Sequence, residues 1–265
     1  MTKEENDLVW LAGFIDGDGC VHLGKGKLSA QVGWVEICQK LTGVLGSILQ
    51  MCGTYNLPLP CIVEPYNLRF NSHKGARLLE QLVPYFRHPR HIIRAPLYLE
   101  FYKVTGKERV KVHSRWLEAK EYGYEDAPVP GWPEDEDLPY LAGFFEAEGC
   151  INIGRLSLKT GQLGGIVTIS QKSPVMLQRV VEVVSRQGLP VPRLYSTSGN
   201  GLVFNRLKGK TLLEKLLPFM HHPEKIARAE FYIKFFNTNG RLQKGIKQKL
   251  YEEEWLDLRA TGRPG

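Results

Sequence analysis

Apolar and polar residues alternate along several short stretches of the chain, a pattern typical of strands with one buried face. In "CVHLG", Val21 and Leu23 point to one side of the strand and His22 to the other, and "CINIG" at 150–154 repeats the pattern. Strands predicted in this way pair as 20–28 with 31–39 and as 150–159 with 165–171, and a further pair lies near 60–71 and near 191–205.

Helical patterns precede and follow these strands. Apolar helices are predicted near 5–17 and 135–147, and further helices at 42–53 and 173–188, the last stopped by Gly188 and Pro190. Two more helices close each half. The last one is introduced by "HPRH" in the first half and by "HHPEK" in the second. The order α-β-β-α-β-β-α-α indicates an α+β fold in which helices cover one face of an antiparallel sheet.

The second half of the chain repeats the first. "LAGFIDGDG" from Leu11 is matched by "LAGFFEAEG" from Leu141, 130 residues later. Three more pairs follow in the same order, with separations of 132 to 134: "EICQK" at 36–40 with "TISQK" at 168–172, "KGARLLEQLVPYF" at 74–86 with "KGKTLLEKLLPFM" at 208–220, and "IIRAPLYLEFY" at 92–102 with "IARAEFYIKFF" at 226–236. The sequence therefore predicts two copies of one unit of roughly 100 residues.

Residues between the copies match neither of them. We expect a first repeat at 1–105, a linker at 106–134 and a second repeat at 135–265. The Pro-rich, acidic stretch "YEDAPVPGWPED" at 124–135 is typical of an extended connector. The tail "KQKLYEEEWLDLR" at 247–259 predicts an additional amphipathic helix.

Composition narrows the class of protein. The chain has 265 residues, is 43% hydrophobic and carries a formal net charge of +7, which favours a polyanionic partner. It contains no apolar run long enough to span a membrane, and "MTKEENDLVW" lacks the features of a secretory signal. The five scattered cysteines form no metal or disulfide pattern, so we expect small buried thiols in a reducing, intracellular compartment.

Both nonapeptides place two acidic residues at the predicted end of a helix, where carbonyl groups disfavour negative charge. The small residues of these helices favour close approach of another backbone, most simply the equivalent helix of the other copy. Packed in parallel, the two helices would bring Asp18 and Glu148 together, with the carbonyl oxygens of Gly17 and Ala147 nearby. Such oxygen ligands suit a hard divalent cation, Mg²⁺ above all.

The earlier acid of each motif has a different environment. Asp16 and Glu146 lie two residues before the final acid, about 200° round the helix, and are expected to be exposed or structural. A polar turn without a ligand is the simpler interpretation of either motif alone. The recurrence of the acidic motif in a duplicated, basic chain favours a bound cation instead.

The two nonapeptides resemble the signature of the LAGLIDADG homing endonucleases in their single-chain, two-motif form, and the resemblance covers nearly the whole chain. It implies two pseudo-symmetric αββαββα units whose motif helices pack at the interface and whose sheets form a saddle over double-stranded DNA. It also implies a monomeric, intron-encoded enzyme that hydrolyses both strands across the minor groove and leaves short 3′ overhangs. In such enzymes the last acid of each motif binds the catalytic metal, here Asp18 and Glu148.

The resemblance implies further catalytic residues. Polar residues at the end of the second strand, here Gln39 and Gln171, would position solvent, although a plain strand-end hydrogen bond is an alternative for Gln39. A basic residue before the last helix matches Lys225 in the second copy and His91 in the first, where Arg90 is the other source of charge. We expect Mg²⁺ as the cofactor, Mn²⁺ as a substitute, and Ca²⁺ to support binding without cleavage.

The sheet face opposite the helices is expected to contact DNA. An antiparallel ribbon fits the major groove, and two half-sites of about one helical turn suggest a site of roughly 20 bp. Because the copies differ at these positions, we expect an asymmetric target; a register error of one residue would invert the set. The residues are His22, Gly24, Trp34, Glu36, Asn67, Arg69, Asn152, Gly154, Thr168, Ser170, Arg193 and Tyr195.

Two other functions remain compatible with the sequence. An intron maturase would use the same basic surface to bind intron RNA, and a DNA-binding regulator would keep the fold without cleavage. The acidic residue at both motif ends argues against the regulator. "GKGK" at 24–27 is not a phosphate-binding loop and is expected to form a basic hairpin tip.

Overall fold

The structure is a computed structural model that describes residues 1–25, 31–40, 42–63, 66–121, 133–155, 163–195, 200–237 and 249–261. The chain divides into two compact units, Met1–Glu136 and Asp137–Gly265, and each is described by itself. Among the described residues, the helices are all too short or too polar to cross a membrane.

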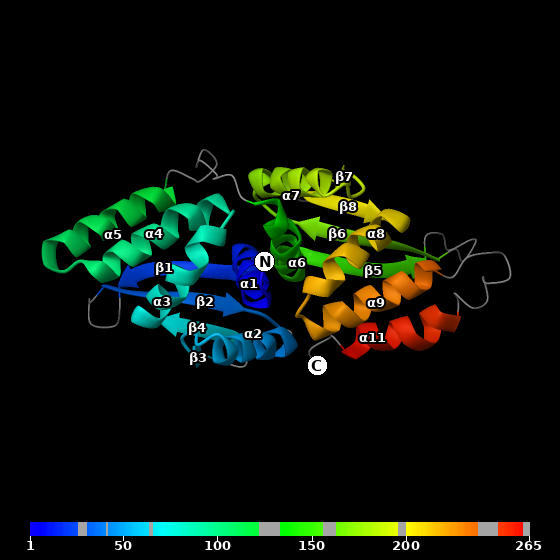
Figure 1. Cartoon of the computed structure of the whole chain (residues 1–265), viewed down its shortest axis with the longest axis horizontal. Coiled ribbons are helices and arrows are strands. Elements are labelled where there is room, and N and C mark those ends of the chain that lie inside the picture. Colours follow the sequence, from blue (N-terminus) through cyan, green and yellow to red (C-terminus); the bar gives the residue numbers. More distant parts are fainter. Residues whose placement is uncertain are drawn as a thin grey trace. The chain divides into compact units, whose positions relative to one another are not determined.

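The first unit is an antiparallel sheet with helices on one face. Figure 1 shows α3 and α4 over this sheet, with strand order β1-β2-β4-β3. Its elements are α1 (Lys3–Asp18), β1 (Gly19–Lys25), β2 (Gln31–Cys38), α2 (Thr42–Thr54), β3 (Cys61–Ile62), β4 (Asn67–Asn71), α3 (His73–Leu82), η1 (Val83–Tyr85), α4 (Pro89–Lys103), α5 (Gly106–Glu121) and η2 (Glu134–Glu136).

The second unit repeats this architecture with strand order β5-β6-β8-β7. Its elements are α6 (Asp137–Glu148), β5 (Gly149–Arg155), β6 (Leu163–Ser170), α7 (Pro174–Arg186), β7 (Arg193–Tyr195), β8 (Gly201–Asn205), α8 (Leu207–Leu216), η3 (Leu217–Phe219), α9 (Pro223–Asn237), η5 (Tyr251–Trp255) and α11 (Leu256–Thr261). The predicted α+β fold with two αββαββα repeats is confirmed.

Strand pairing has the same register in both units. Gly19 pairs with Ile37 as Gly149 pairs with Ile169, and Glu36 pairs with Arg69 as Thr168 pairs with Val203. A strained turn recurs as well, because Ser72 and Arg206 both have a positive φ, of 51° and 47°. Tyrosine hydroxyls donate to the carbonyl oxygens of these two residues and help to hold the turns, Tyr98 at 2.9 Å and Tyr232 at 3.2 Å.

The core of each unit lies between the sheet and its helices. Alternate strand residues such as Val35, Ile37, Val167 and Ile169 are fully buried, while their neighbours along the strand are half-buried or exposed. This is the alternation that the sequence predicts for a sheet with one covered face. Residues 26–27 of the predicted hairpin tip at 24–27 lie outside the described part of the chain, whereas Lys25 pairs with Gln31.

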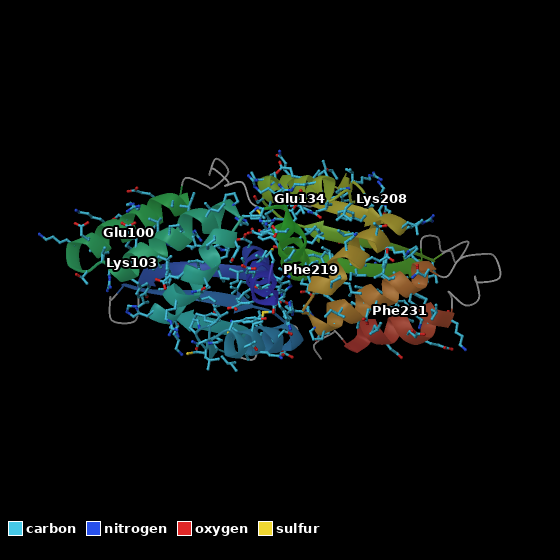
Figure 2. All side chains as sticks on the ribbon, in the orientation of Figure 1. Glu100, Lys103, Glu134, Lys208, Phe219 and Phe231 are labelled. Carbon is cyan, nitrogen blue, oxygen red and sulfur yellow. The ribbon has the colours of Figure 1, made fainter. Side chains whose placement is uncertain are left out.

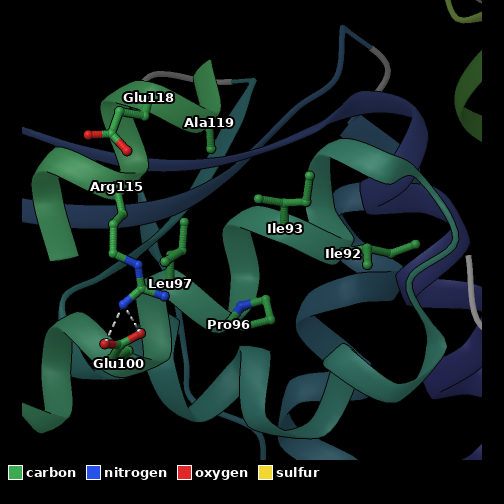
Figure 3. A pocket seen from close by; sticks show the side chains of 8 residues that line it. All are labelled: Ile92, Ile93, Pro96, Leu97, Glu100, Arg115, Glu118 and Ala119. Carbon is green, nitrogen blue, oxygen red and sulfur yellow. Dashed lines mark hydrogen bonds and ion pairs between the residues drawn. The ribbon is translucent and has the colours of Figure 1, made fainter. Parts of the chain in front are cut away.

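The helix α5 corrects the predicted linker, which was expected to begin at residue 106. Figure 3 shows α5 packed against α4, with Arg115 Nη1 donating to both carboxylate oxygens of Glu100 at 2.7 and 2.9 Å. Trp116 is 2% exposed and lies under the guanidinium of Arg94. A charged, weakly amphipathic sequence concealed this helix, because much of it faces solvent. Residues 122–132 lie outside the described part of the chain.

The predicted C-terminal helix is confirmed over the described residues 249–261. Trp255 is 1% exposed, and its ring centroid lies 5.5 Å from that of Phe231 on α9, the residue labelled in Figure 2. Lys234 donates to Glu254 at 2.7 Å and adds a polar contact at the surface. One buried tryptophan thus anchors this segment to the second unit.

Candidate active site in each unit

The final acid of each motif lies where a helix passes directly into a strand. α1 ends at Asp18 and β1 begins at Gly19, and α6 ends at Glu148 with β5 beginning at Gly149. A Cβ atom on Gly19 would lie 2.6 Å from the carbonyl oxygen of Ile15, and one on Gly149 would lie 2.4 Å from that of Phe145. Only glycine fits this junction. The glycine that ends each motif therefore lets the helix pass directly into the strand and places the acid where the strand begins.

A glutamine at the end of the second strand contacts this acid in both units. Gln171 Nε2 donates to Glu148 Oε1 at 2.9 Å, and Gln39 Nε2 donates to Asp18 Oδ2. Gln171 is itself oriented, because its Oε1 accepts from the backbone N–H of Lys172 at 2.7 Å. The structure thus brings together, within each unit, the acid and the glutamine that the sequence singled out.

Basic side chains bind the carbonyl groups at the same helix end. Lys225 Nζ donates to the carbonyl oxygens of Glu146 at 2.6 Å and Gly149 at 2.8 Å, and Arg90 Nη2 donates to that of Gly19 at 3.1 Å. These cations compensate the negative end of each motif helix and supply positive charge close to the acid.

His91 does not occupy the position of Lys225, which corrects the sequence-based match. Its side chain is completely buried, and its Nδ1 lies 2.7 Å from Asp16 Oδ1. Burial lowers the pKa of His91, so the imidazole is neutral and donates its Nδ1–H to the carboxylate. Arg90, one residue earlier, takes the place at the carbonyl end of α1.

The earlier acid of each motif fastens the turn before the last helix. Asp16 Oδ2 accepts from the backbone N–H groups of Arg87 at 2.7 Å and His88 at 2.8 Å. Glu146 accepts in the same way from His221 and His222, the latter at 2.7 Å. Both carboxylates are completely buried. The structural role expected for these acids is confirmed, and the exposed alternative is wrong.

The predicted DNA-facing residues lie on the uncovered sheet face of their unit. In the first unit His22, Trp34, Glu36 and Arg69 are half-buried, whereas the residues next to them in each strand are buried. In the second unit all the predicted residues on this face are exposed or half-buried, and they are Asn152, Gly154, Thr168, Ser170, Arg193 and Tyr195. The predicted register is therefore correct, and Gly24 and Asn67 share the face of the first unit.

Two residues beside the second acid were missed by sequence reasoning. Lys172 and Asn200 line a surface cavity of about 520 Å³ together with Glu148, Gln171 and Ser170. A signal for the lysine existed, because "QK" ends both matched strand segments, at 39–40 and 171–172. Asn200 carried no such signal, since only strand pairing brings its carbonyl to the backbone N–H of Gln171, at 3.2 Å.

The cysteines are not the buried thiols that composition suggested. Only Cys52 is buried among the five, while Cys38, Cys61 and Cys150 are exposed and Cys20 is half-buried. The reason is the strand register, which turns Cys20 and Cys38 toward the uncovered face. Partial burial and the nearby carboxylate of Glu36 raise the pKa of Cys38. All five thiols are free, as the sequence predicted.

The donor set around each acid suits a cation that is bound only partly by protein. One half-buried carboxylate and the backbone carbonyls at the end of each motif helix would meet the preference of Mg²⁺ for oxygen ligands. Within the described residues, no group of three or more histidine, cysteine or acidic side chains is arranged to hold a metal. Water and phosphate oxygens would have to complete such a shell, as they do in many Mg²⁺ sites of phosphoryl-transfer enzymes.

Comparison with solved structures identifies the fold as that of the two-domain LAGLIDADG proteins. The LAGLIDADG homing endonuclease I-GzeII in complex with its DNA target matches with a TM-score of 0.67 at 10% identity, over 96% of each chain. The meganuclease I-AabMI bound to uncleaved DNA matches with a TM-score of 0.65 at 16% identity, over 97% of this chain and 99% of that one.

A third solved structure shows the same likeness. I-SmaMI bound to an uncleaved DNA target in the presence of calcium ions matches with a TM-score of 0.56 at 15% identity, over 96% of each chain. No protein-family model and no curated protein matches the chain. At these identities the likeness defines the fold, while the activity has to be argued from the site.

Proposed function

We propose that this chain is a site-specific endonuclease that cuts both strands of duplex DNA with the help of a divalent cation. The observation that carries the proposal is the same pair in both units, an acid at the end of the motif helix that accepts a hydrogen bond from a strand-end glutamine. Two equivalent acids in one chain suit two equivalent phosphodiesters, one on each strand. The net charge of +7 suits a polyanionic substrate.

The uncovered faces of the two sheets are the proposed DNA-binding surfaces. An antiparallel ribbon fits the major groove, and a half-site of about one turn for each unit gives a target of roughly 20 bp. The target is asymmetric because equivalent positions carry different side chains, for example Glu36 against Thr168. Since one chain contains both motifs, it acts as a monomer.

Asp18 and Glu148 are the proposed metal ligands, with the carbonyl oxygens of Gly17 and Ala147 as further donors. A bound Mg²⁺ would supply Lewis-acid stabilisation of the phosphate and would lower the pKa of a bound water. Gln39 and Gln171 orient the carboxylates and solvent, and Arg90 and Lys225 contribute positive charge toward the scissile phosphates. Cleavage across the minor groove leaves short 3′ overhangs. Mn²⁺ substitutes for Mg²⁺, and Ca²⁺ supports binding alone.

The proposal is tested by selection from a library of randomised DNA duplexes. The full chain is incubated with Mg²⁺, the cut duplexes are sequenced, and a parallel sample with Ca²⁺ is sorted for binding. We expect discrete double-strand cuts within one long sequence in Mg²⁺ and enrichment of the same sequence, uncut, in Ca²⁺. Enrichment without cutting in Mg²⁺ would instead support a DNA-binding regulator. Binding of structured RNA alone would support a maturase.

A further inference from the structure

One arginine on the uncovered face of the first unit is held on two sides. Arg69 of β4 donates to Glu36 Oε1 on β2 through both Nε, at 3.1 Å, and Nη2, at 2.7 Å. Its guanidinium carbon also lies 5.2 Å from the ring centroid of Trp34. His22 of β1 packs on the same tryptophan, with ring centroids 4.2 Å apart. Three strands therefore contribute to one arginine clamp, formed by His22, Trp34, Glu36 and Arg69.

The clamp leaves a defined part of the guanidinium for a ligand. Glu36 occupies the edge formed by Nε and Nη2, so the edge formed by the two amino groups points away from the carboxylate. The side chain of Arg69 is 31% exposed. A fixed planar fork with one outward edge is suited to bidentate recognition, since little freedom is lost when it binds.

Stability alone does not account for this arrangement. Partly exposed ion pairs contribute little to folding, and stacked aromatic rings on an uncovered sheet face gain less than buried ones. A carboxylate on a surface meant for DNA also repels phosphate groups. The presence of Glu36 is explained if the benefit of orienting Arg69 exceeds the loss of attraction to the DNA backbone.

The second unit lacks the clamp at the same register positions. Ile166, Thr168 and Val203 occupy the places of Trp34, Glu36 and Arg69, as the identical strand pairing shows. An arginine stands instead on the edge strand β7, where Arg193 pairs with Val203 at the place that Cys61 has in the first unit. The centre of this face therefore offers methyl groups and one hydroxyl instead of a fixed cation.

We propose that Arg69 is a specificity-determining residue that reads one guanine in the major groove of the half-site bound by the first unit. Glu36 and Trp34 are positioning residues that aim the guanidinium at the O6 and N7 atoms of the base, the commonest specific contact of arginine in DNA complexes. The apolar centre of the second unit suits the methyl group of thymine at the corresponding position. The inference rests on the proposed function, because it requires that the chain binds duplex DNA.

The experiment is a binding selection from randomised duplexes. The full chain carries Asp18→Asn and Glu148→Gln so that cleavage does not distort the selection. We compare this parent with Arg69→Lys, which keeps the charge but removes the fork, and with Arg77→Lys as a matched control on α3, the helix layer. We expect Arg69→Lys to lose a guanine preference of roughly 5- to 150-fold at one position and Arg77→Lys to leave every preference unchanged.

Glu36→Gln distinguishes an orienting role of Glu36 from a merely structural one. Without the carboxylate, we expect binding to random DNA to tighten while the guanine preference weakens, because Arg69 is no longer aimed. If the parent selects a site and all its guanine preferences survive in Arg69→Lys, this inference alone is overturned. The same holds if Arg69→Lys loses preference uniformly at all positions. A parent that enriches no DNA at all overturns the proposed function and this inference together.

Discussion

Gln171 donates a hydrogen bond of 2.9 Å to Glu148, and Gln39 donates one to Asp18 at the equivalent place of the other unit. These residues are 23 and 21 positions apart in the chain, so strand pairing is needed to bring them together. The repetition of this contact in two sequences that have otherwise diverged supports a common role. It also defines which side chains a mutational test should address first.

Replacing Gln171 by Leu should slow cleavage by about 10- to 100-fold, the usual effect of removing a residue that orients a metal ligand. Leucine has a similar size and cannot hold the carboxylate. Single-turnover cleavage of the selected duplex measures the effect, while gel-shift affinity should stay within about twofold. Gln178→Leu on the exposed side of α7 is the control. Equal loss of binding and cleavage would contradict an orienting role.

Asp18→Asn and Glu148→Gln should each reduce cleavage more severely than the glutamine variant, by more than about 100-fold, while DNA binding is retained. Each change removes a carboxylate without altering its shape. Cleavage of the strands should be assayed separately on a duplex labelled at both ends. Glu118→Gln on α5 serves as the control, because that carboxylate is exposed on the helix side. Full activity in either acid variant would refute the proposed metal site.

Asp16→Asn should destabilise the first unit by at least about 2 kcal/mol, although Asp18→Asn should have little effect on stability. The buried Asp16 carboxylate accepts from two backbone N–H groups and from His91. An amide would either turn its nitrogen toward the backbone donors or force His91 to move its proton to Nε2, which is buried and has no hydrogen-bond partner among the described residues. Urea denaturation of both variants provides the measurement. The pair is matched, since the same change is made two residues apart. Similar stability of the two variants would argue against this assignment.

Acid should destabilise the protein through two buried histidines. Burial lowers the pKa of His88 and of His222 to about 3, whereas the unfolded value is near 6.5. The unfolded chain therefore binds more protons than the native one between pH 6.5 and 3. The free energy of unfolding does not depend on these histidines above pH 6.5. Below pH 6.5 it falls by about 1.4 kcal/mol per pH unit for each histidine.

Urea denaturation at pH 7.5, 6.0 and 5.0 tests this expectation. His88→Asn is the informative variant, because asparagine keeps an acceptor for the backbone N–H of Arg90 at the start of α4. It should be close to wild type in stability at pH 7.5 and lose part of the acid sensitivity. Parallel pH profiles for the two proteins would show that His88 is not responsible.

Thiol reactivity should report the register of the sheet. Burial raises the pKa of Cys52 to about 11, which reduces its thiolate fraction roughly 100-fold relative to a thiol with the ordinary pKa of 9.0. Peptide mass spectrometry after brief maleimide treatment should show Cys38, Cys61 and Cys150 alkylated and Cys52 intact. Bound target DNA should protect Cys38 and leave Cys52 unchanged. Rapid alkylation of Cys52 in the folded protein would contradict the described packing.

Much of the architecture was readable from the sequence because it depends on local patterns. The period-two alternation around Val21 and Leu23 identified both the strand and its buried face. The match between 36–40 and 168–172 then aligned the two halves, so that a strand predicted in one half was also predicted in the other. Glycine follows the final acid of each motif at the helix–strand junction, since no other residue avoids the carbonyl of the preceding turn. Such features require only near neighbours in the chain.

Contacts between distant segments were decided by tertiary structure alone. Position counting aligned His91 with Lys225, yet packing buries the imidazole against Asp16 and lets Arg90 reach the carbonyl of Gly19. The helix at 106–121 was concealed because tertiary contacts such as Trp116 with Arg94, more than periodicity, define its buried side. The sequence by itself determined the repeated unit, its sheet faces and its acids. Only folding decided which polar partners those acids meet, because hydrogen bonds depend on ångström-scale placement that periodicity does not encode.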